Sequence, residues 1–365
     1  MKRRDVLIGG GAALGVSGMA IGGSFASMGS MDEYTRAMAA LRAPLGAGAD
    51  MAELVRFATL AANSHNTQPW RFTREDKSVR ISPDVTRRTP AVDPDDHHMF
   101  VSLGCASENL MLAAASRGLV GETRFDPEGT GAVVFDYTQG AEQASALCDA
   151  IPRRQSARVE YDGRAVSTAD LATLESATQT PSVSLTLITD RAQINRVRDL
   201  ILAGNTAQMA DKAFMAELKD WMRFNPNAAL ARGDGLFSAS SGNPTLPTWI
   251  GRPMFDLAFK AEAENEKYAR HLASSAGLAV FVGEAATHEN WVRVGQACQR
   301  FALQATALGL KLAFVNQPVE VASLRPDLAA LLGKPGQRPD IVMRFGYGPD
   351  VPMSPRRPVA AVMDA

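Results

Sequence analysis

The chain has 365 residues, of which 46% are hydrophobic, and this is enough for a substantial core in one large α/β body or about two domains. Its 38 basic and 39 acidic residues are well mixed and give a formal net charge of −1, so we exclude nucleic acid as a partner. The three cysteines, Cys105, Cys148 and Cys298, lack CxxC spacing and indicate neither a disulfide framework nor a zinc site. We expect them to pack as small apolar side chains.

Residues 1–30 predict a trafficking segment. Lys2-Arg3-Arg4 precedes an apolar, glycine-rich run from Val6 to Ser27, and this arrangement resembles a twin-arginine signal. We therefore expect the twin-arginine export machinery as a partner and a periplasmic or extracytoplasmic location. The alternative is an uncleaved membrane anchor, because the apolar run approaches the ~20 residues that span a bilayer.

The polar segment from Ser64 to Phe72 is the most informative part of the chain. Residues 54–61 before it have apolar side chains at helical spacing, and residues 70–72 and 79–81 after it predict short strands. The segment therefore lies in a loop that leaves a helix, where donors and acceptors are free to bind a ligand. A helix cap or turn made by a single residue of the segment is the alternative.

The order Ser64-x-Asn66-x-Gln68-Pro69-Trp70 resembles the flavin-binding loop of the nitroreductase-like FMN oxidoreductases. The resemblance implies an α+β fold and FMN as the cofactor. It assigns Ser64, Asn66 and Gln68 to the polar edge of the isoalloxazine ring and the ribityl chain, with Pro69 in the same binding loop. The residues at 62–63 are Ala-Asn, where the family often has Pro-Ser.

A repeat with an offset of 191 residues (295 − 104) links the two halves of the chain. Each copy predicts a helix of about 20 residues with small residues on its packing side, a Gly-Leu end and a following strand, at residues 122–125 and 312–315. Chance alignment of two amphipathic helices is the alternative. The matching residues are Gly104, Ala106, Leu112, Ala114, Gly118 and Leu119, which recur as Gly295, Ala297, Leu303, Ala305, Gly309 and Leu310.

Nitroreductase-like proteins are usually homodimers with flavins at the interface, so the repeat implies two modules fused into one chain. Each module would contain a β-sheet flanked by helices. We expect module 1 at residues 31–150 and module 2, with a C-terminal arm, at residues 151–365. Each half of the flavin site occurs once in the sequence, and we therefore expect one FMN per chain.

Basic residues of the second module predict the phosphate site. The family's Arg-x-Ser-x-Arg segment matches Arg154, Ser156 and Arg158, and its C-terminal basic residues match Arg356 and Arg357. Planar guanidinium groups bind a phosphate monoester bidentately, and Arg154 and Arg158 would point to the same side of an extended segment. We expect one of the two C-terminal arginines to reach the phosphate, with a solvent-exposed tail as the alternative.

The resemblance also places residues 314–318 against the flavin N5, through which the flavin exchanges hydride. A backbone N–H of Asn316 or Gln317 would hydrogen-bond N5, and a helix expected to begin near Val319 would add its dipole. Because the cofactor carries the chemistry, we expect no catalytic acid-base pair or nucleophile.

Residues 205–259 are too long for an ordinary connection. Aromatic residues among Gly, Pro, Ser and Asn predict a lid over a planar ligand or, equally, an arm that wraps the other module. Fused actinobacterial proteins that this chain resembles have a lid that seals the flavin.

Three histidines are candidates for functional roles. His65 lies in the flavin loop and either lines the pocket or packs. His97 and His98 are adjacent in a predicted helix, where successive side chains point about 100° apart, so they cannot readily bind one ion together. We predict no metal site.

The sequence therefore predicts an exported oxidoreductase that passes hydride or electrons through FMN to a small planar acceptor, such as a nitroaromatic or a quinone. The electron donor is NAD(P)H or a separate redox partner, and the chain has no dinucleotide-binding fingerprint. An FMN storage or sequestering protein is the alternative function.

Overall fold

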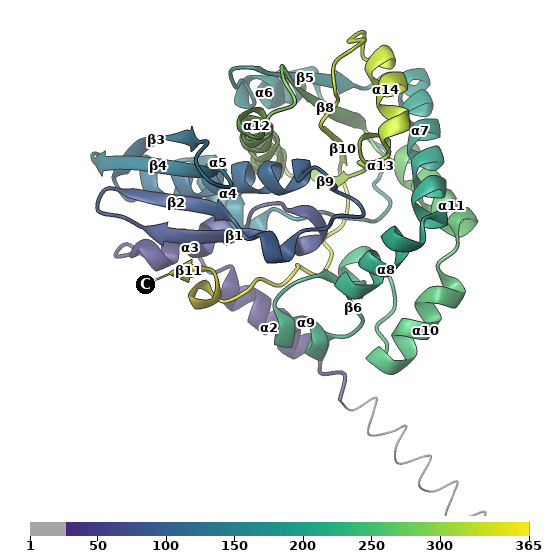
Figure 1. The fold of residues 1–365 in the computed structure, drawn as a ribbon, viewed down its shortest axis with the longest axis horizontal. Coiled ribbons are helices and arrows are strands. Elements are labelled where there is room, and N and C mark those ends of the chain that lie inside the picture. Colours follow the sequence, from purple (N-terminus) through teal and green to yellow (C-terminus); the bar gives the residue numbers. More distant parts are fainter. Residues whose placement is uncertain (1–26, 365) are drawn as a thin grey trace, which may run out of the picture.

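The structure, a computed structural model, describes residues 27–364 and has an α+β fold built around two β-sheets (Figure 1). The predicted trafficking segment lies almost entirely outside the described residues. No helix within residues 27–364 is both long and apolar enough to cross a bilayer.

The first sheet has five strands in the order β11-β1-β2-β4-β3. Neighbouring strands in this sheet are antiparallel, except that β11 pairs with β1 in parallel. This pairing brings the C-terminal arm onto the sheet. In β1, Trp70 and Phe72 are buried while Arg71 between them is exposed, as expected for a strand with one face on the core. The strands are β1 (Trp70–Arg74), β2 (Ser78–Pro83), β3 (Leu119–Asp126), β4 (Ala132–Gln139) and β11 (Met363–Asp364).

The second sheet has four antiparallel strands in the order β5-β8-β10-β9. Its strands are β5 (Val183–Ile188), β8 (Gly277–Gly283), β9 (Lys311–Phe314) and β10 (Ile341–Gly346). In both sheets, therefore, four strands from one half of the chain lie side by side, and counted along the chain within the sheet their order is first, second, fourth, third. The two halves share one topology.

Helices α4 (His97–Ala115) and α12 (His288–Ala307) cross between the two sheets (Figure 1). They are the two helices that the sequence repeat predicts, and they begin 191 residues apart (288 − 97). A Cβ atom built on Gly104 would lie 2.0 Å from the carbonyl oxygen of Val292, so the helix backbones touch at this glycine. One apolar core contains these helices and buried strand residues of both sheets.

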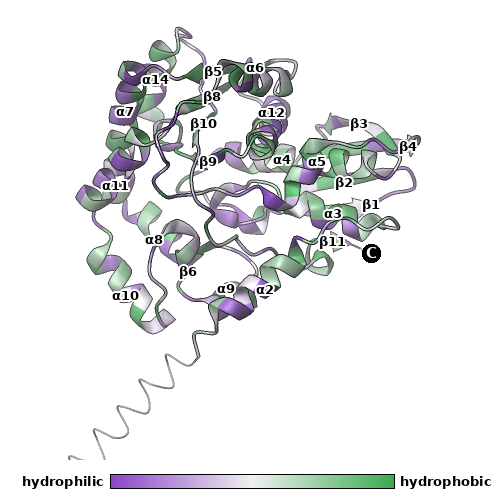
Figure 2. Cartoon of the chain, turned by 180° about the vertical axis from the view of Figure 1, so that it is seen from behind, coloured by the Kyte–Doolittle hydropathy of each residue, from purple (hydrophilic) through white to green (hydrophobic). Residues whose placement is uncertain are grey.

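Outside residues 189–276, the remaining α-helices pack around the core. They are α2 (Met31–Leu41), α3 (Met51–Thr59), α5 (Ala146–Ala150), α6 (Thr168–Ala177), α13 (Gln317–Glu320) and α14 (Arg325–Leu331). Seen from behind, the outer helices carry hydrophilic and hydrophobic residues together, as amphipathic covering helices do (Figure 2).

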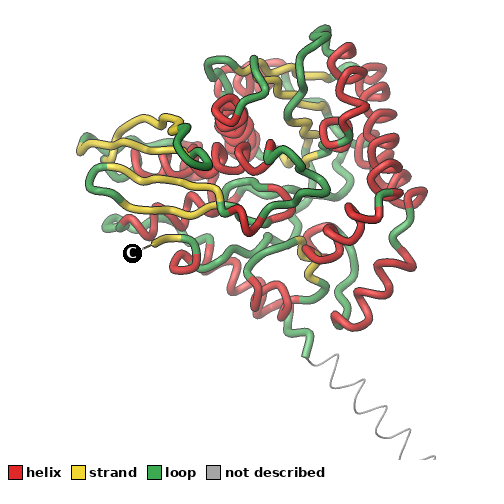
Figure 3. The backbone as a smooth tube through the Cα atoms, viewed as in Figure 1, coloured by secondary structure: helices red, strands yellow, loops and turns green. Residues whose placement is uncertain are grey.

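Residues 189–276, which we call the inserted segment, separate β5 from β8 and have no counterpart between β1 and β2. The segment is mostly helical (Figure 3). It contains α7 (Arg191–Ala210), α8 (Lys212–Trp221), β6 (Met222–Arg223), α9 (Pro226–Arg232), β7 (Leu236–Phe237), α10 (Thr248–Ala258) and α11 (Ala261–Ala273). The stretch expected as a lid or arm, residues 205–259, lies inside it.

Candidate functional site

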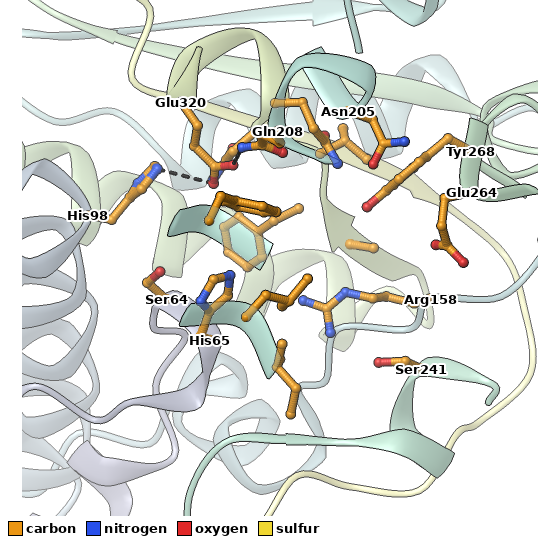
Figure 4. Close-up of a pocket in the computed structure, with 18 of the residues that line it drawn as sticks. Ser64, His65, His98, Arg158, Asn205, Gln208, Ser241, Glu264, Tyr268 and Glu320 are labelled. Carbon is orange, nitrogen blue, oxygen red and sulfur yellow. Dashed lines mark hydrogen bonds and ion pairs between the residues drawn. The ribbon is translucent and has the colours of Figure 1, made fainter. Parts of the chain in front are cut away.

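A cavity of about 200 Å³ lies where the two halves of the chain meet (Figure 4). The first half contributes the loop after α3 and one side of α4. The second half contributes the inserted segment and the loop after β9. The main lining segments are residues 62–65, α4, α7, α11 and residues 313–317.

Four of the predicted cofactor residues line this cavity: Ser64, Arg158, Asn316 and Gln317. The guanidinium of Arg158 points into it and makes no hydrogen bond or ion pair with any residue from 27 to 364. The Oε1 atom of Gln317 is buried and also lacks a hydrogen-bond partner among the described residues. A buried acceptor such as Gln317 Oε1 is costly to leave without a partner, and the half-buried Arg158 brings an unpaired positive charge to the same cavity, so the cavity fits a polar ligand with an anionic group.

The loop after β9 is shaped by Asn316. Its Oδ1 accepts a hydrogen bond from the backbone N–H of Val342 at 2.9 Å, which ties the loop to β10. The helix expected to begin near Val319 begins at Gln317 and is a single turn. Because a four-residue helix aligns few peptide dipoles, the helix dipole that we expected near the flavin N5 is weaker than predicted.

Asn66 and Gln68 do not line the cavity. Both have a left-handed backbone, with φ of 53° and 54°. Asn66 Nδ2 donates to the carbonyl oxygen of Pro355 at 3.1 Å, and Gln68 Nε2 donates to that of Gly233 at 2.8 Å. Gln68 Oε1 accepts from the backbone N–H of Arg357 at 2.8 Å. The amides therefore join this loop to the inserted segment and to the C-terminal arm.

Arg356 is buried and uses all its guanidinium nitrogens within the protein. It donates to the carbonyl oxygens of Thr59 (2.5 Å), Leu60 (3.2 Å) and Ala61 (3.1 Å) and to Asn66 Oδ1 (2.9 Å). The last carbonyls of a helix have no partner inside it, so Arg356 closes the end of α3. These contacts leave it no free donor for the phosphate expected at this position.

Arg154 and Arg357 also lie outside the cavity lining. Arg154 Nη2 donates to the carbonyl oxygen of Leu60 at 2.9 Å, and burial lowers the pKa of this guanidinium. Arg357 Nη2 donates to the carbonyl oxygen of Ala361 at 2.8 Å, and its Nη1 lies 3.6 Å from Asp84 Oδ2. Both side chains connect separate segments, and their contact with a phosphate stays a prediction.

Pro69 and Ser156 make backbone contacts with other segments and do not line the cavity. Pro69 is buried, and its carbonyl oxygen accepts from the N–H of Asp84 at 3.0 Å. Ser156 forms a parallel bridge with Leu312 of β9. That bridge fixes the chain just before Arg158 and so helps to set where Arg158 enters the cavity.

The sequence model of the Nitroreductase family matches residues 151–347, more than half of the chain. This protein belongs to the nitroreductase family. The match includes the segment with Arg158 and the loop with Asn316 and Gln317.

Two relatives align with most of this chain and over most of their own length. "Putative NAD(P)H nitroreductase Rv3131" of Mycobacterium tuberculosis (strain ATCC 25618 / H37Rv) is 25% identical over 333 residues, covering 86% of this chain and 92% of the relative. "Uncharacterized protein Rv3127" of the same strain is 24% identical over 328 residues, covering 85% and 91%.

Solved structures similar to this nitroreductase are smaller and more distant. The FMN-dependent nitroreductase NfnB of Mycobacterium smegmatis, in complex with NADPH, has a TM-score of 0.41 and 13% identity, covering 60% of this chain and 97% of its own. A nitroreductase with bound FMN from Desulfitobacterium hafniense has a TM-score of 0.37 and 16% identity, covering 59% and 94%. The family assignment rests on the sequence match.

The cavity of this nitroreductase also contains a His–Glu pair to which the sequence assigned no role. His98 Nε2 on α4 lies 3.4 Å from Glu320 Oε1 on α13 (Figure 4). Gln208 Nε2 on α7 donates to the other carboxylate oxygen at 2.6 Å. Burial acts to lower the pKa of His98, but the Glu320 carboxylate and the charge of Asp93 outweigh it and raise that pKa. Nothing local in the sequence could reveal the pair, because its members lie in different halves.

His65 is the second histidine of the cavity. Its backbone is left-handed, with φ of 45°, and its Nδ1 is buried without a hydrogen-bond partner among residues 27–364. Burial lowers its pKa to about 4, so the imidazole is neutral at pH 7.

His97 points elsewhere. Its Nε2 lies 3.0 Å from Asp340 Oδ1, whereas His98 faces Glu320, so the adjacent histidines do not share a partner. Within the described residues, no group of three His, Cys, Asp or Glu side chains is placed to hold a metal ion.

The inserted segment both covers the cavity and contacts the first half of the chain. Phe214 and Leu218 of α8 line the cavity. Asp234 forms ion pairs with Arg223 of the same segment, at 2.6 Å, and with Arg87 of the first half. The segment therefore contacts both the cavity and the first half, and its action as a lid stays a prediction.

Proposed function

We propose that this protein is an FMN-dependent oxidoreductase that passes hydride or electrons to a small planar acceptor, such as a nitroaromatic or a quinone. FMN, when bound, supplies a ring that accepts and donates hydride. The observation that carries the proposal is the cavity between the halves of this nitroreductase, where Arg158 and Gln317 Oε1 have no hydrogen-bond partner among residues 27–364.

The lining suits the two chemically different parts of FMN. Arg158 offers a planar, permanently charged donor for the phosphate, and Ser64, Asn316 and Gln317 offer polar groups for the edge of the ring. Apolar side chains from the inserted segment and from β9 would cover the ring faces and exclude water: Met209, Phe214, Leu218, Met222, Leu236, Phe259 and Phe314. Asn66, Gln68 and Arg356 support the site by holding the loop between α3 and β1 in place.

The same proposal includes a fusion of two modules with one FMN per chain. Three observations support it: the equal offset of α4 and α12, the shared strand order of the two sheets, and a cavity to which both halves contribute. The inserted segment is present in the second half alone, so the halves cannot form equivalent sites.

We propose NAD(P)H or a separate redox partner as the electron donor, and export by the twin-arginine machinery to a periplasmic or extracytoplasmic location. Support for the donor comes from the printed name of the M. tuberculosis relative, "Putative NAD(P)H nitroreductase Rv3131". Support for export comes from the sequence of residues 1–30. Detection of the protein in the periplasmic fraction of its host, lost when Arg3 and Arg4 are both replaced by lysine, would test the route.

FMN storage or sequestration is the second candidate, and the helices of the inserted segment over the cavity favour it. Anaerobic titration with NADH, NADPH and dithionite, followed by the flavin absorbance, separates the two functions. Bleaching by a nicotinamide and recovery on addition of a quinone are expected for the oxidoreductase. Bleaching by dithionite alone, without recovery by an acceptor, would favour storage.

A further inference from the structure

Two histidines on the cavity wall have pKa values that are shifted in opposite directions. His65 is kept neutral by burial, which lowers its pKa to about 4. His98, buried as well, keeps a raised pKa because of its contact with Glu320. When the environment shifts the pKa values of two groups in one site in opposite directions, the group with the raised pKa is the candidate acid.

The position of Glu320 is fixed from two sides. Its Oε2 accepts from Gln208 Nε2 at 2.6 Å, and its backbone N–H donates to the carbonyl oxygen of Asn316 at 2.8 Å. Glu320 therefore lies one helical turn beyond the loop that we propose for the flavin N5. The pair with His98 is consequently close to the place where an acceptor would be reduced.

Charged groups from three parts of the chain act on His98. Glu320 and Asp93 raise its pKa, and Arg338 lowers it. His97, Asp340 and His65 also interact electrostatically with His98. Burial lowers the pKa of His97 and of His65. The Nε2 atom faces Glu320, so Nδ1 is the ring nitrogen without a hydrogen-bond partner within residues 27–364.

We propose that His98, held as an imidazolium by Glu320, is the proton donor for the acceptor that is reduced in this cavity. The proposal rests on the proposed oxidoreductase function. Reduction of a quinone to a hydroquinone takes one hydride and one proton. The hydride comes from the reduced cofactor; the Nδ1–H bond of His98 breaks as the new O–H bond of the hydroquinone forms. Neutral His98 then takes a proton from water when the product leaves.

Histidine NMR of the purified protein tests the charge state without any turnover. In the wild-type protein, His98 should titrate above its ordinary value of about 6.5. Glu320→Gln should move that titration to lower pH, because it removes the carboxylate. A wild-type His98 that is already neutral at pH 6, or one whose titration is the same in Glu320→Gln, would overturn the proposal.

Reoxidation of the dithionite-reduced holoprotein tests the role in turnover. His98→Gln should slow reoxidation by a soluble quinone about 10²-fold, the usual effect of losing a general acid. Ferricyanide takes one electron and no proton, so its rate should not change. The wild-type quinone rate should fall as the pH rises through the His98 titration, and this fall should disappear in His98→Gln. His288→Gln is the matched control, because His288 is exposed and lies outside the cavity lining.

The outcomes distinguish a failure of the His98 role from a failure of the proposed oxidoreductase function. Equal slowing with quinone and ferricyanide, or an unchanged quinone rate in His98→Gln, would overturn the role of His98 alone. A reduced wild-type protein that no quinone reoxidises would overturn the proposed function, and the role of His98 with it.

Discussion

Gly104 and Gly295 pack against each other where α4 and α12 cross. A Cβ atom on Gly104 would lie 2.0 Å from the carbonyl oxygen of Val292, and a Cβ atom on Gly295 would lie 2.1 Å from that of Val101. The contact is reciprocal, because the same offset of 191 residues relates Gly104 to Gly295 and Val101 to Val292 (292 − 101). A side chain at either glycine would force the helices apart.

We expect Gly104→Ala and Gly295→Ala each to lower the free energy of unfolding by about 3 kcal/mol or more, since the methyl group would clash with backbone atoms that cannot turn aside. Urea denaturation measures the change. Gly46→Ala is the control: a Cβ there meets nothing within 4 Å, and its effect should stay within about 0.5 kcal/mol. If Gly104→Ala were as stable as the wild-type protein, the close contact between the backbones of α4 and α12 would be contradicted.

Arg356→Ala should destabilise the flavin-free protein by about 3 kcal/mol, because the carbonyls of Thr59, Leu60 and Ala61 lose a charged donor in a buried place. Thermal unfolding without added FMN is the measurement. Arg153→Ala, at an exposed position, should leave the melting temperature nearly unchanged. If Arg356→Ala affected only FMN binding, Arg356 would be a phosphate ligand and not a cap of α3.

Arg158→Gln should weaken FMN binding about 10- to 100-fold, the range expected when a phosphate loses a charged hydrogen-bond donor. The apo-protein should keep its stability, because Arg158 has no partner within residues 27–364 to lose. Riboflavin, which lacks the phosphate, should bind wild type and variant alike in a fluorescence titration. Equal weakening of FMN and riboflavin would place Arg158 at the ring instead.

Asp234→Asn should loosen the inserted segment, because it leaves Arg223 and Arg87 without their shared, buried carboxylate. We expect limited proteolysis within residues 205–259 to become at least about tenfold faster. This corresponds to a decrease of roughly 1.4 kcal/mol in the free energy of local opening. Asp220→Asn is the matched control, since Asp220 pairs with Arg252 on the surface. Identical cleavage of both variants would show that Asp234 does not hold the segment.

The sequence was informative where a pattern is local or repeats. Small residues at helical spacing around Gly104 and Gly295 predicted both crossing helices, and alternating apolar residues around Trp70 and Phe72 predicted β1. These elements follow from near neighbours in the chain, so their positions could be read directly.

The partners of polar side chains were not readable in the same way. Asn66 and Gln68 form a recognisable motif, but their hydrogen bonds go to Pro355 and Gly233, which only the folded chain brings near. The His98–Glu320 pair was missed for the same reason. Long-range contacts of this kind depend on tertiary packing, which no local pattern specifies.

The ratio of FMN to protein chain tests the central claim most directly. Native mass spectrometry of the purified protein, with the released flavin identified after denaturation, gives this ratio and the cofactor together. A cavity built jointly by the two halves predicts one FMN per chain. Two FMN per chain would contradict the single joint site, and a chain that takes up no FMN even when it is supplied in excess would contradict the flavin assignment itself.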